Sequence, residues 1–261
     1  MITDIHVHPV LAKGDRSCFG VQADKIIDCM DRVGIAKANL MPIMSQNGSY
    51  YGYNSDEETT FAADFLSDAF KKYPGRFYGM VRLNAYLPMD FLSGFVTERI
   101  INGPVHGVKL LTEMNMADRR VEPLAAFLEK HGVPVLIHAW YKTVELSGAE
   151  SSPADVAVLA GKFPGLNIIM AHMRGSRFRG VQDIKRHKNV SIDTSGSESE
   201  DGYLAYALAE LGERRILYGS DYPGRDIATA LGRIESVDMP NDVRAEIFNG
   251  NAARLLGGER S

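Results

Sequence analysis

Short apolar segments recur along the chain, and each is followed by a stretch in which apolar residues return at helical spacing. Most of the short segments are apolar at successive positions, which is typical of parallel strands covered on both faces. The eight segments are residues 4–8, 38–41, 77–83, 107–110, 133–138, 166–172, 190–193 and 216–218. Eight strand–helix units predict an α/β protein with a (β/α)8 TIM barrel, in preference to an open sheet.

The last part of the chain extends beyond these eight units. Pro240 is expected to open a helix, and the pair Asn249 and Gly250 is expected to break it. Asn251 then fits the N-cap of a last short helix. We expect this last helix to pack as an appendage outside the eight units.

The composition is that of an ordinary globular protein, with 45% hydrophobic and 24% charged residues among 261. One barrel commonly uses about 250 residues, so we expect residues 1–261 to form a single domain. The 29 basic and 33 acidic side chains leave a net charge of −4, and no basic run is long enough to follow a phosphate backbone. Nucleic acid is therefore not an expected partner.

The sequence shows neither a secretion signal nor an apolar run of membrane-spanning length. Its two cysteines, Cys18 and Cys29, fit no metal motif and indicate a reducing compartment. We therefore expect a cytoplasmic protein without a membrane partner. Whether it forms a homo-oligomer stays open.

The first apolar segment carries Asp4, His6 and His8 at alternate positions. Side chains two residues apart on a strand share a face, so both imidazoles can bind one metal ion without a bend in the backbone. Pro9 cannot donate to a sheet, so the strand should end there and leave His8 at its carboxyl end. The alternative, two hydrogen-bonded core histidines, fits a single histidine better than this pair.

Three further polar residues end or follow predicted strands, namely His138, His172 and Asp221. Barrel enzymes build their active sites at the carboxyl ends of the strands. Taken singly, His138 fits a core position and Asp221 fits a helix N-cap, but together the residues favour a metal centre. Histidine and carboxylate ligands suit Zn²⁺ first, with Mn²⁺, Fe²⁺ or Co²⁺ as alternatives.

These residues belong to an ordered series of motifs. The series is Asp-X-His-X-His at 4–8, Gly-Val-Lys-Leu at 107–110, His138 and His172, Gly-Ser-Asp-Tyr-Pro at 219–223, and Gly-Asn-Ala-Ala-Arg-Leu-Leu at 250–256. The chain thereby resembles the amidohydrolase superfamily over nearly its whole length. Within it, the chain is similar to the amidohydrolase-related branch that contains aminocarboxymuconate-semialdehyde decarboxylase.

The resemblance implies a metal-dependent barrel enzyme with one divalent ion. Its ligands would be the four residues at the matching positions, His6, His8, His138 and Asp221. His172 then matches the histidine that contacts the substrate or a bound water.

Lys109 stands near the position where binuclear members carry a carboxylated lysine that bridges two metals. We expect one metal, and carboxylation of Lys109 would be the sign of a second. An unmodified Lys109 would instead steady an anionic substrate, and a lysine that merely extends to the barrel rim fits the sequence equally well.

The reaction we expect is hydrolysis of an amide, ester or lactone bond in a small molecule by a metal-activated water. His172 would polarise the carbonyl oxygen or orient the water, and Asp221 would carry the proton. The alternative is metal-dependent non-oxidative decarboxylation of a small aromatic or unsaturated acid. The same residues serve both reactions, so the sequence does not choose.

Three other functions fit less well. TatD-like nucleases place a metal-binding glutamate where this chain has Lys109, and Glu113 lies four residues further on. PHP-type phosphoesterases end with Asp-X-His, whereas here Pro223 follows Asp221 and Tyr222. A non-catalytic metal-binding scaffold would have no reason to keep every polar strand-end residue.

The family's substrates do not transfer, because the chain is short and reads Met-Arg-Gly at 173–175 where the family has small residues. Arg174, Arg177 and Arg179 follow His172, and Arg225 follows Asp221. The four arginines are expected to bind a carboxylate of a small anionic substrate, which is aromatic or cyclic and rests near Trp140 and the loop 50–53. The alternative is that they are solvated or pair with rim acids at positions 198, 200 and 201.

Overall fold

Eight strands form one parallel sheet in the computed structural model, which describes residues 1–45, 55–141, 149–173, 178–196 and 201–257. They are β1 (Thr3–Val7), β3 (Lys37–Leu40), β5 (Phe77–Arg82), β6 (Gly107–Leu110), β7 (Val135–His138), β8 (Ile168–Ala171), β9 (Val190–Asp193) and β10 (Ile216–Leu217). Each lies within or beside one of the apolar segments of the sequence.

The strands follow one another in chain order and all neighbours are parallel. Hydrogen bonds then join the last strand to the first. The N–H of Ile5 donates to the carbonyl of Tyr218 at 2.9 Å, and the N–H of Asp221 donates to the carbonyl of His6 at 2.9 Å. The predicted (β/α)8 barrel is therefore confirmed.

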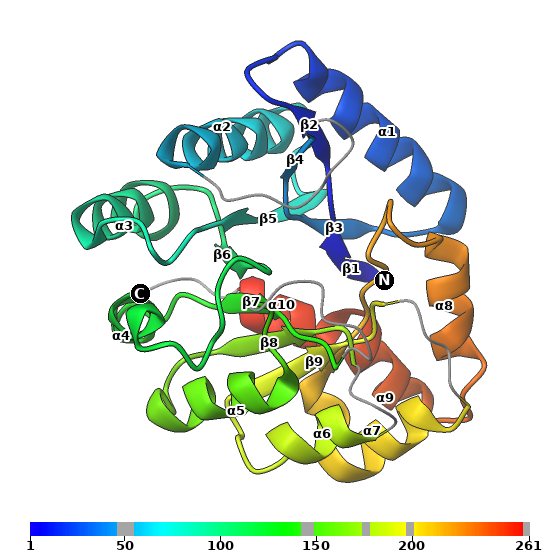
Figure 1. Cartoon of the computed structure of the whole chain (residues 1–261). Helices are drawn as coiled ribbons and strands as arrows, with labels where there is room; N and C mark the ends of the chain where they lie inside the picture. The colour runs from blue at the N-terminus through cyan, green and yellow to red at the C-terminus, as the bar shows by residue number, and fades with distance from the viewer. Residues whose placement is uncertain (46–54, 142–148, 174–177, 197–200, 258–261) are drawn as a thin grey trace.

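Eight helices, one after each strand of this sheet, form a ring around the strands (Figure 1). They are α1 (Cys18–Val33), α2 (Asp56–Lys72), α3 (Met89–Val96), α4 (Glu122–Lys130), α5 (Pro153–Lys162), α6 (Arg179–Ile184), α7 (Tyr203–Leu211) and α8 (Ile227–Glu235). Short helical turns adjoin them at η1 (Thr97–Ile101), η2 (Arg119–Val121) and η3 (Glu213–Arg215). None of the helices in the described ranges is both long and apolar enough to cross a membrane.

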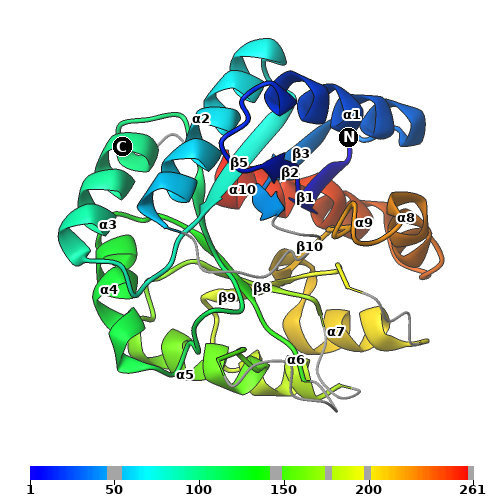
Figure 2. The same ribbon diagram turned by 45° about the horizontal axis from the view of Figure 1, so that its top comes forward.

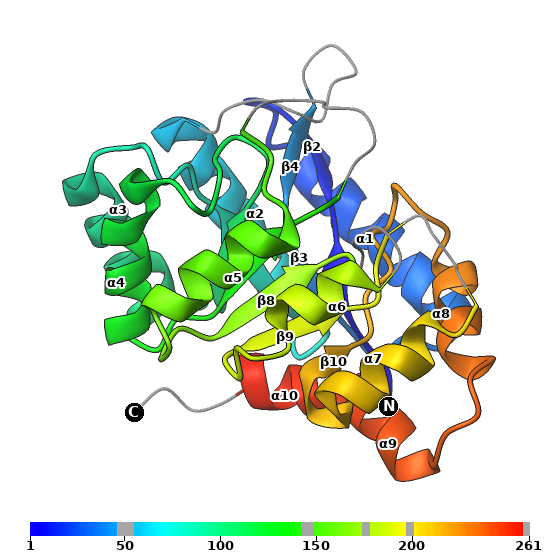
Figure 3. The same ribbon diagram turned by 60° about the horizontal axis from the view of Figure 1, so that its bottom comes forward.

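Two short strands that the sequence did not predict lie beyond the carboxyl end of the barrel. They are β2 (Val10–Ala12) and β4 (Ile43–Ser45), which pair in parallel with Val10 opposite Ile43. Each follows a proline, Pro9 or Pro42, and the N–H of Ile43 donates to the carbonyl of Pro9. Figure 3 shows this small sheet at the end of the molecule opposite the last helix.

The end of the chain closes the amino-terminal end of the barrel. It runs as α9 (Asn241–Ala245), η4 (Glu246–Gly250) and α10 (Asn251–Leu256), which follow one another without a break (Figure 2). Thr3, the first residue of β1, donates to Asn249 at 2.8 Å. The expected break at Asn249 and Gly250 is therefore wrong, because a π-helical turn carries the chain through it.

The last helix is part of the core and not an appendage. Ala252 and Leu256 of α10 are buried against the apolar residues inside the barrel, Ile5, Met80, Leu136, Ile169, Ala171 and Leu217. Asn251 is fully buried and does not cap the helix. Its Nδ2 donates to the carbonyls of Glu213 at 2.7 Å and Ile216 at 2.8 Å, so it ties α10 to the start of β10.

Candidate active site

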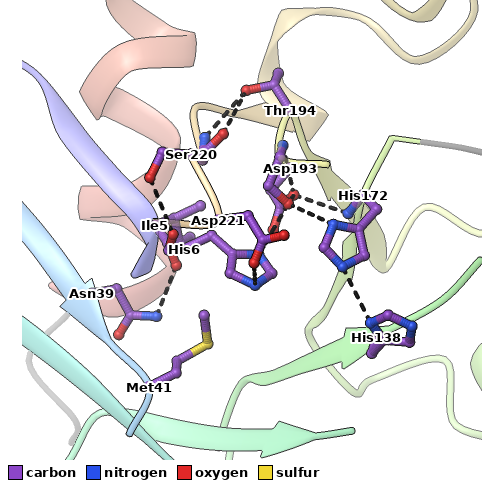
Figure 4. Close-up of polar contacts among 12 residues, drawn as sticks. Ile5, His6, Asn39, Met41, His138, His172, Asp193, Thr194, Ser220 and Asp221 are labelled. Carbon is purple, nitrogen blue, oxygen red and sulfur yellow. Dashed lines mark hydrogen bonds and ion pairs between the residues drawn. The ribbon is translucent and has the colours of Figure 1, made fainter. Parts of the chain in front are cut away.

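His6 and His8 come from the carboxyl end of β1, and their rings meet at one place. The two Nε2 atoms are 3.0 Å apart. Oδ1 of Asp221 lies 3.6 Å from Nε2 of His6 and 3.5 Å from Nε2 of His8. Asp221 follows β10 with a left-handed backbone (φ 66°), a conformation that costs energy in a residue other than glycine and is typical of functional sites. Figure 4 shows Asp221 directly beside His6.

The other ring nitrogen of each histidine has a partner that fixes where its hydrogen lies. Nδ1 of His6 is 2.7 Å from Oδ2 of Asp193, and Nδ1 of His8 is 2.8 Å from the carbonyl of Met41. A carboxylate and a carbonyl only accept, so each Nδ1 carries the hydrogen and each Nε2 presents a lone pair. Burial lowers the pKa of His6 and lowers that of His8 to about 3, so both rings are neutral.

Two lone pairs and a carboxylate oxygen therefore face one another. The ligand atoms of His6, His8 and Asp221 all lie within 4.8 Å of one another. Buried acceptors that converge in this way are stabilised by a positive charge between them, and neutral imidazoles with a carboxylate are typical ligands of a divalent metal. These residues fit the metal ion that the sequence predicts.

Asp193, the last residue of β9, is a site residue that sequence reasoning missed. Its carboxylate is fully buried and accepts from Nδ1 of His6, from the N–H of His172 at 3.0 Å and from the N–H of Ser195 at 3.0 Å. Oγ of Ser195 donates to it at 2.5 Å. Figure 4 shows the carboxylate between His6 and His172. Its place at a strand end was a signal, but no motif spacing distinguished it.

His172 and His138 form a second pair of rings beside the first. His172 follows β8 with a left-handed backbone (φ 59°), and its Nδ1 lies 3.0 Å from Oγ of Ser195. Its Nε2 lies 3.1 Å from Nδ1 of His138. Nε2 of His138 lies 2.6 Å from Oε1 of Glu150, a second carboxylate that the sequence did not indicate.

His138 is therefore oriented differently from His6 and His8. Among the described residues, its ring nitrogens are not in the close grouping with His6, His8 and Asp221. His138 still lies near enough to His6 and His8 for its charge to lower the pKa of both rings. The structure thus places His138 beside the candidate metal centre without showing it as a ligand.

Lys109, near the end of β6, is paired in register with a second buried cation, Arg82 of β5. Arg82 forms an ion pair with Glu113, which lies buried beside it. Lys109 is 1% exposed, and its Nζ has no hydrogen-bond partner within the described parts of the chain. Burial lowers the pKa of Lys109 to about 8, although the charges of Asp193 and Asp221 oppose this shift. A buried ammonium at the end of a barrel strand is a candidate for anion binding.

The site opens into a cavity of about 830 Å³. Seven predicted site residues line it, namely His6, His8, Lys109, His138, Trp140, His172 and Asp221. The Trp140 ring meets the His172 ring edge to face, with 5.1 Å between their centroids. An aromatic wall beside polar groups is typical of a pocket for an aromatic or cyclic ligand.

The predicted arginine cluster is only partly visible. Arg174, Arg177 and the loop 50–53 lie outside the described residues. The guanidinium of Arg179 lies over the ring of Tyr141 at 4.5 Å, whereas Arg225 lines the cavity. Of the two arginines that can be placed, one therefore reaches the cavity wall.

Comparison with known proteins decides the family. The model of the family described as Amidohydrolase matches residues 3–258. The chain belongs to the amidohydrolase family. The predicted resemblance is thereby confirmed, and so is the prediction of an enzyme of this family. No curated protein sequence matches this amidohydrolase.

Solved structures share its fold. The 5-carboxyvanillate decarboxylase from Sphingomonas paucimobilis superposes with a TM-score of 0.72 at 17% identity, over 99% of either chain. The 2,6-dihydroxybenzoate decarboxylase from Rhizobium gives 0.73 at 18% identity, over 97% of this chain and 98% of that one. The 5-carboxyvanillate decarboxylase from Novosphingobium aromaticivorans, with manganese and 4-hydroxy-3-methoxy-5-nitrobenzoic acid, gives 0.72 at 19% identity, over 97% and 96%. At these identities the likeness shows the barrel fold of this amidohydrolase.

Proposed function

We propose that this amidohydrolase is a single-domain, metal-dependent decarboxylase of a small aromatic or unsaturated acid. One observation carries the proposal: the converging acceptors of His6, His8 and Asp221 share a cavity with Lys109, a buried ammonium without a partner among the described residues. Metal-capable ligands beside a buried cation suit a substrate that brings its own carboxylate. The decarboxylases among the structural neighbours favour this reaction over the hydrolysis that the sequence put first.

One divalent ion would be held by His6, His8 and Asp221, with His138 as the fourth ligand that the family resemblance implies. When bound, such an ion supplies a Lewis acid for the oxygen atoms of the substrate. Manganese is named in a neighbour's structure, while zinc remains the ion expected from the ligand types.

The other residues would bind and position the acid. Lys109 would pair with a carboxylate, and Trp140 would pack against the face of the ring. His172 would contact a polar group of the substrate from its place beside Trp140. Arg174, which follows His172 by two positions, remains a proposed carboxylate-binding residue on sequence grounds.

Asp221 would move the proton. Burial raises the pKa of Asp221 to about 6, above the usual value for an aspartate, which favours proton transfer by this carboxyl group. The carbon–carbon bond to the carboxylate breaks, carbon dioxide leaves, and the proton from Asp221 forms the new carbon–hydrogen bond. A proton from solvent restores the acid.

The test is to offer the manganese-loaded protein a panel of hydroxylated aromatic acids together with the matching amides and methyl esters. Decarboxylation predicts release of carbon dioxide from at least one acid, followed by headspace analysis, and Asp221→Asn should abolish it. Asp242→Asn, which removes an exposed carboxylate of α9, is the matched control and should react normally. Conversion of an amide or ester without carbon dioxide release would refute the decarboxylase proposal and support hydrolysis.

A further inference from the structure

Away from the histidines, most of the charged side chains in the cavity wall are basic. Three basic side chains line it: Lys109 from β6, Lys25 from α1 and Arg225 from the segment between β10 and α8. The acidic residue among its described lining residues is Asp221. The segment that carries Arg225, drawn in orange, rises beside α1 in Figures 1 and 3. Two elements far apart in sequence therefore bring positive charge to the same cavity.

The two outer cations, Lys25 and Arg225, can be compared with other cations in the described parts of the chain. Several cations elsewhere pair with acids, namely Lys72 with Asp24 at 2.5 Å, Arg76 with Asp31 at 2.6 Å, Lys162 with Glu122 at 2.6 Å and Lys185 with Glu210 at 3.0 Å. Neither Lys25 nor Arg225 forms an ion pair with any acid in the described ranges. Arg225 donates from Nη1 to the carbonyl of Gly224 at 2.7 Å, which leaves its remaining donors to solvent or a ligand.

The positive charges lie at two depths. Lys109 is buried at the end of its strand, whereas Lys25 and Arg225 are exposed at the rim. Apolar side chains, among them Ile26 and Ile43, line the cavity with them. A volume of about 830 Å³ lies near the top of the range for ligand pockets, roughly 300–1,000 Å³. The cavity is therefore large for a ligand with a single charged end.

We propose that Lys25 and Arg225 form a rim subsite for a second anionic group, so that the preferred ligand is an elongated apolar or aromatic molecule with an acid at each end. One acid would sit by Lys109 and the reacting groups, and the other would sit between α1 and the segment before α8. This inference rests on the proposed function in one respect, namely that the acid beside Lys109 is the one that reacts. Two exposed cations favour a diacid over a monoacid by Coulomb attraction. This attraction is modest for each ion pair and is weakened by salt.

Three rigid diacids of increasing length serve as probes: terephthalate, naphthalene dicarboxylate and biphenyl dicarboxylate, each compared with its monomethyl ester. Titration calorimetry on the manganese-loaded protein measures their binding and needs no turnover. At least one diacid should bind about fivefold more tightly than its monoester, given the usual strength of two exposed ion pairs. The double variant Lys25→Gln/Arg225→Gln should lose this preference and keep its affinity for the monoester, and high salt should reduce the preference in the wild type.

The matched control is Lys71→Gln/Arg214→Gln, which removes the same net charge from exposed positions outside the cavity lining. It should keep the preference. The inference is overturned if no diacid is preferred by the wild type, if the preference survives in the rim variant, or if the control variant loses it equally. Decarboxylation is tested separately, by carbon dioxide release. Absence of carbon dioxide release would refute the proposed function without affecting the binding result. Absence of a preference for diacids would refute the rim subsite without affecting the proposed function.

Discussion

Replacing Asp193 by asparagine should weaken the metal centre, because Asp193 holds the ring of the proposed ligand His6. Four donors point at this buried carboxylate: Nδ1 of His6, the N–H of His172, and the N–H and Oγ of Ser195. An asparagine has one acceptor oxygen, and in either orientation its NH₂ group faces a donor. At least one buried donor loses its partner, which costs about 1–3 kcal/mol. For a chain of this size the melting temperature should fall by roughly 2–12 °C.

The same change should lower the affinity for a divalent metal by about 10–100-fold, since Asp193 holds the His6 ring in the orientation that presents Nε2. Calorimetric titration of the metal-free protein with Mn²⁺ measures the affinity, and thermal unfolding without metal measures the stability separately. Asp242→Asn again serves as the control. A folded Asp193→Asn protein that binds Mn²⁺ as tightly as the wild type would refute the role given to this residue.

Two further predictions concern charge and the closing helix. Lys109 binds a carboxylate only when protonated, so with its pKa lowered to about 8 the affinity for benzoate should be retained below that pH and fall as pH rises through it. Calorimetry should show this dependence vanish in Lys109→Met; an unchanged pH profile would remove Lys109 from anion binding. Asn251→Ala should lower the free energy of unfolding by about 1–3 kcal/mol, because the buried carbonyl of Ile216 and the half-buried carbonyl of Glu213 lose their donor. A loss near zero in denaturant unfolding would contradict that.

The barrel could be predicted from the sequence because the apolar pattern of each strand–helix unit is a local feature. Apolar runs such as 107–110 and 190–193 coincide with β6 and β9, and the polar residues that end or follow the strands lie around one cavity. The strands β2 and β4 escaped prediction because each has three residues and follows a proline that ends the preceding segment. They pair because they follow the neighbouring strands β1 and β3, and three residues are too few to show a periodic pattern.

Asn251 and Asp193 show why the rest could not be predicted. Asparagine before an apolar stretch is a good N-cap, so local preference favoured that role for Asn251. In the fold its amide serves two carbonyls that precede it by more than thirty residues. Asp193 likewise gains its role from a histidine 187 positions away. Both functions depend on contacts that only the closed barrel creates.

The metal content of the protein tests the central claim most directly. Protein purified without chelator, then dialysed against Mn²⁺ or Zn²⁺, should hold one ion per chain by elemental analysis, and His8→Ala should lower that content. Two ions per chain would support carboxylation of Lys109 and a binuclear centre. A content well below one ion per chain that neither metal restores would contradict a metal centre at His6, His8 and Asp221.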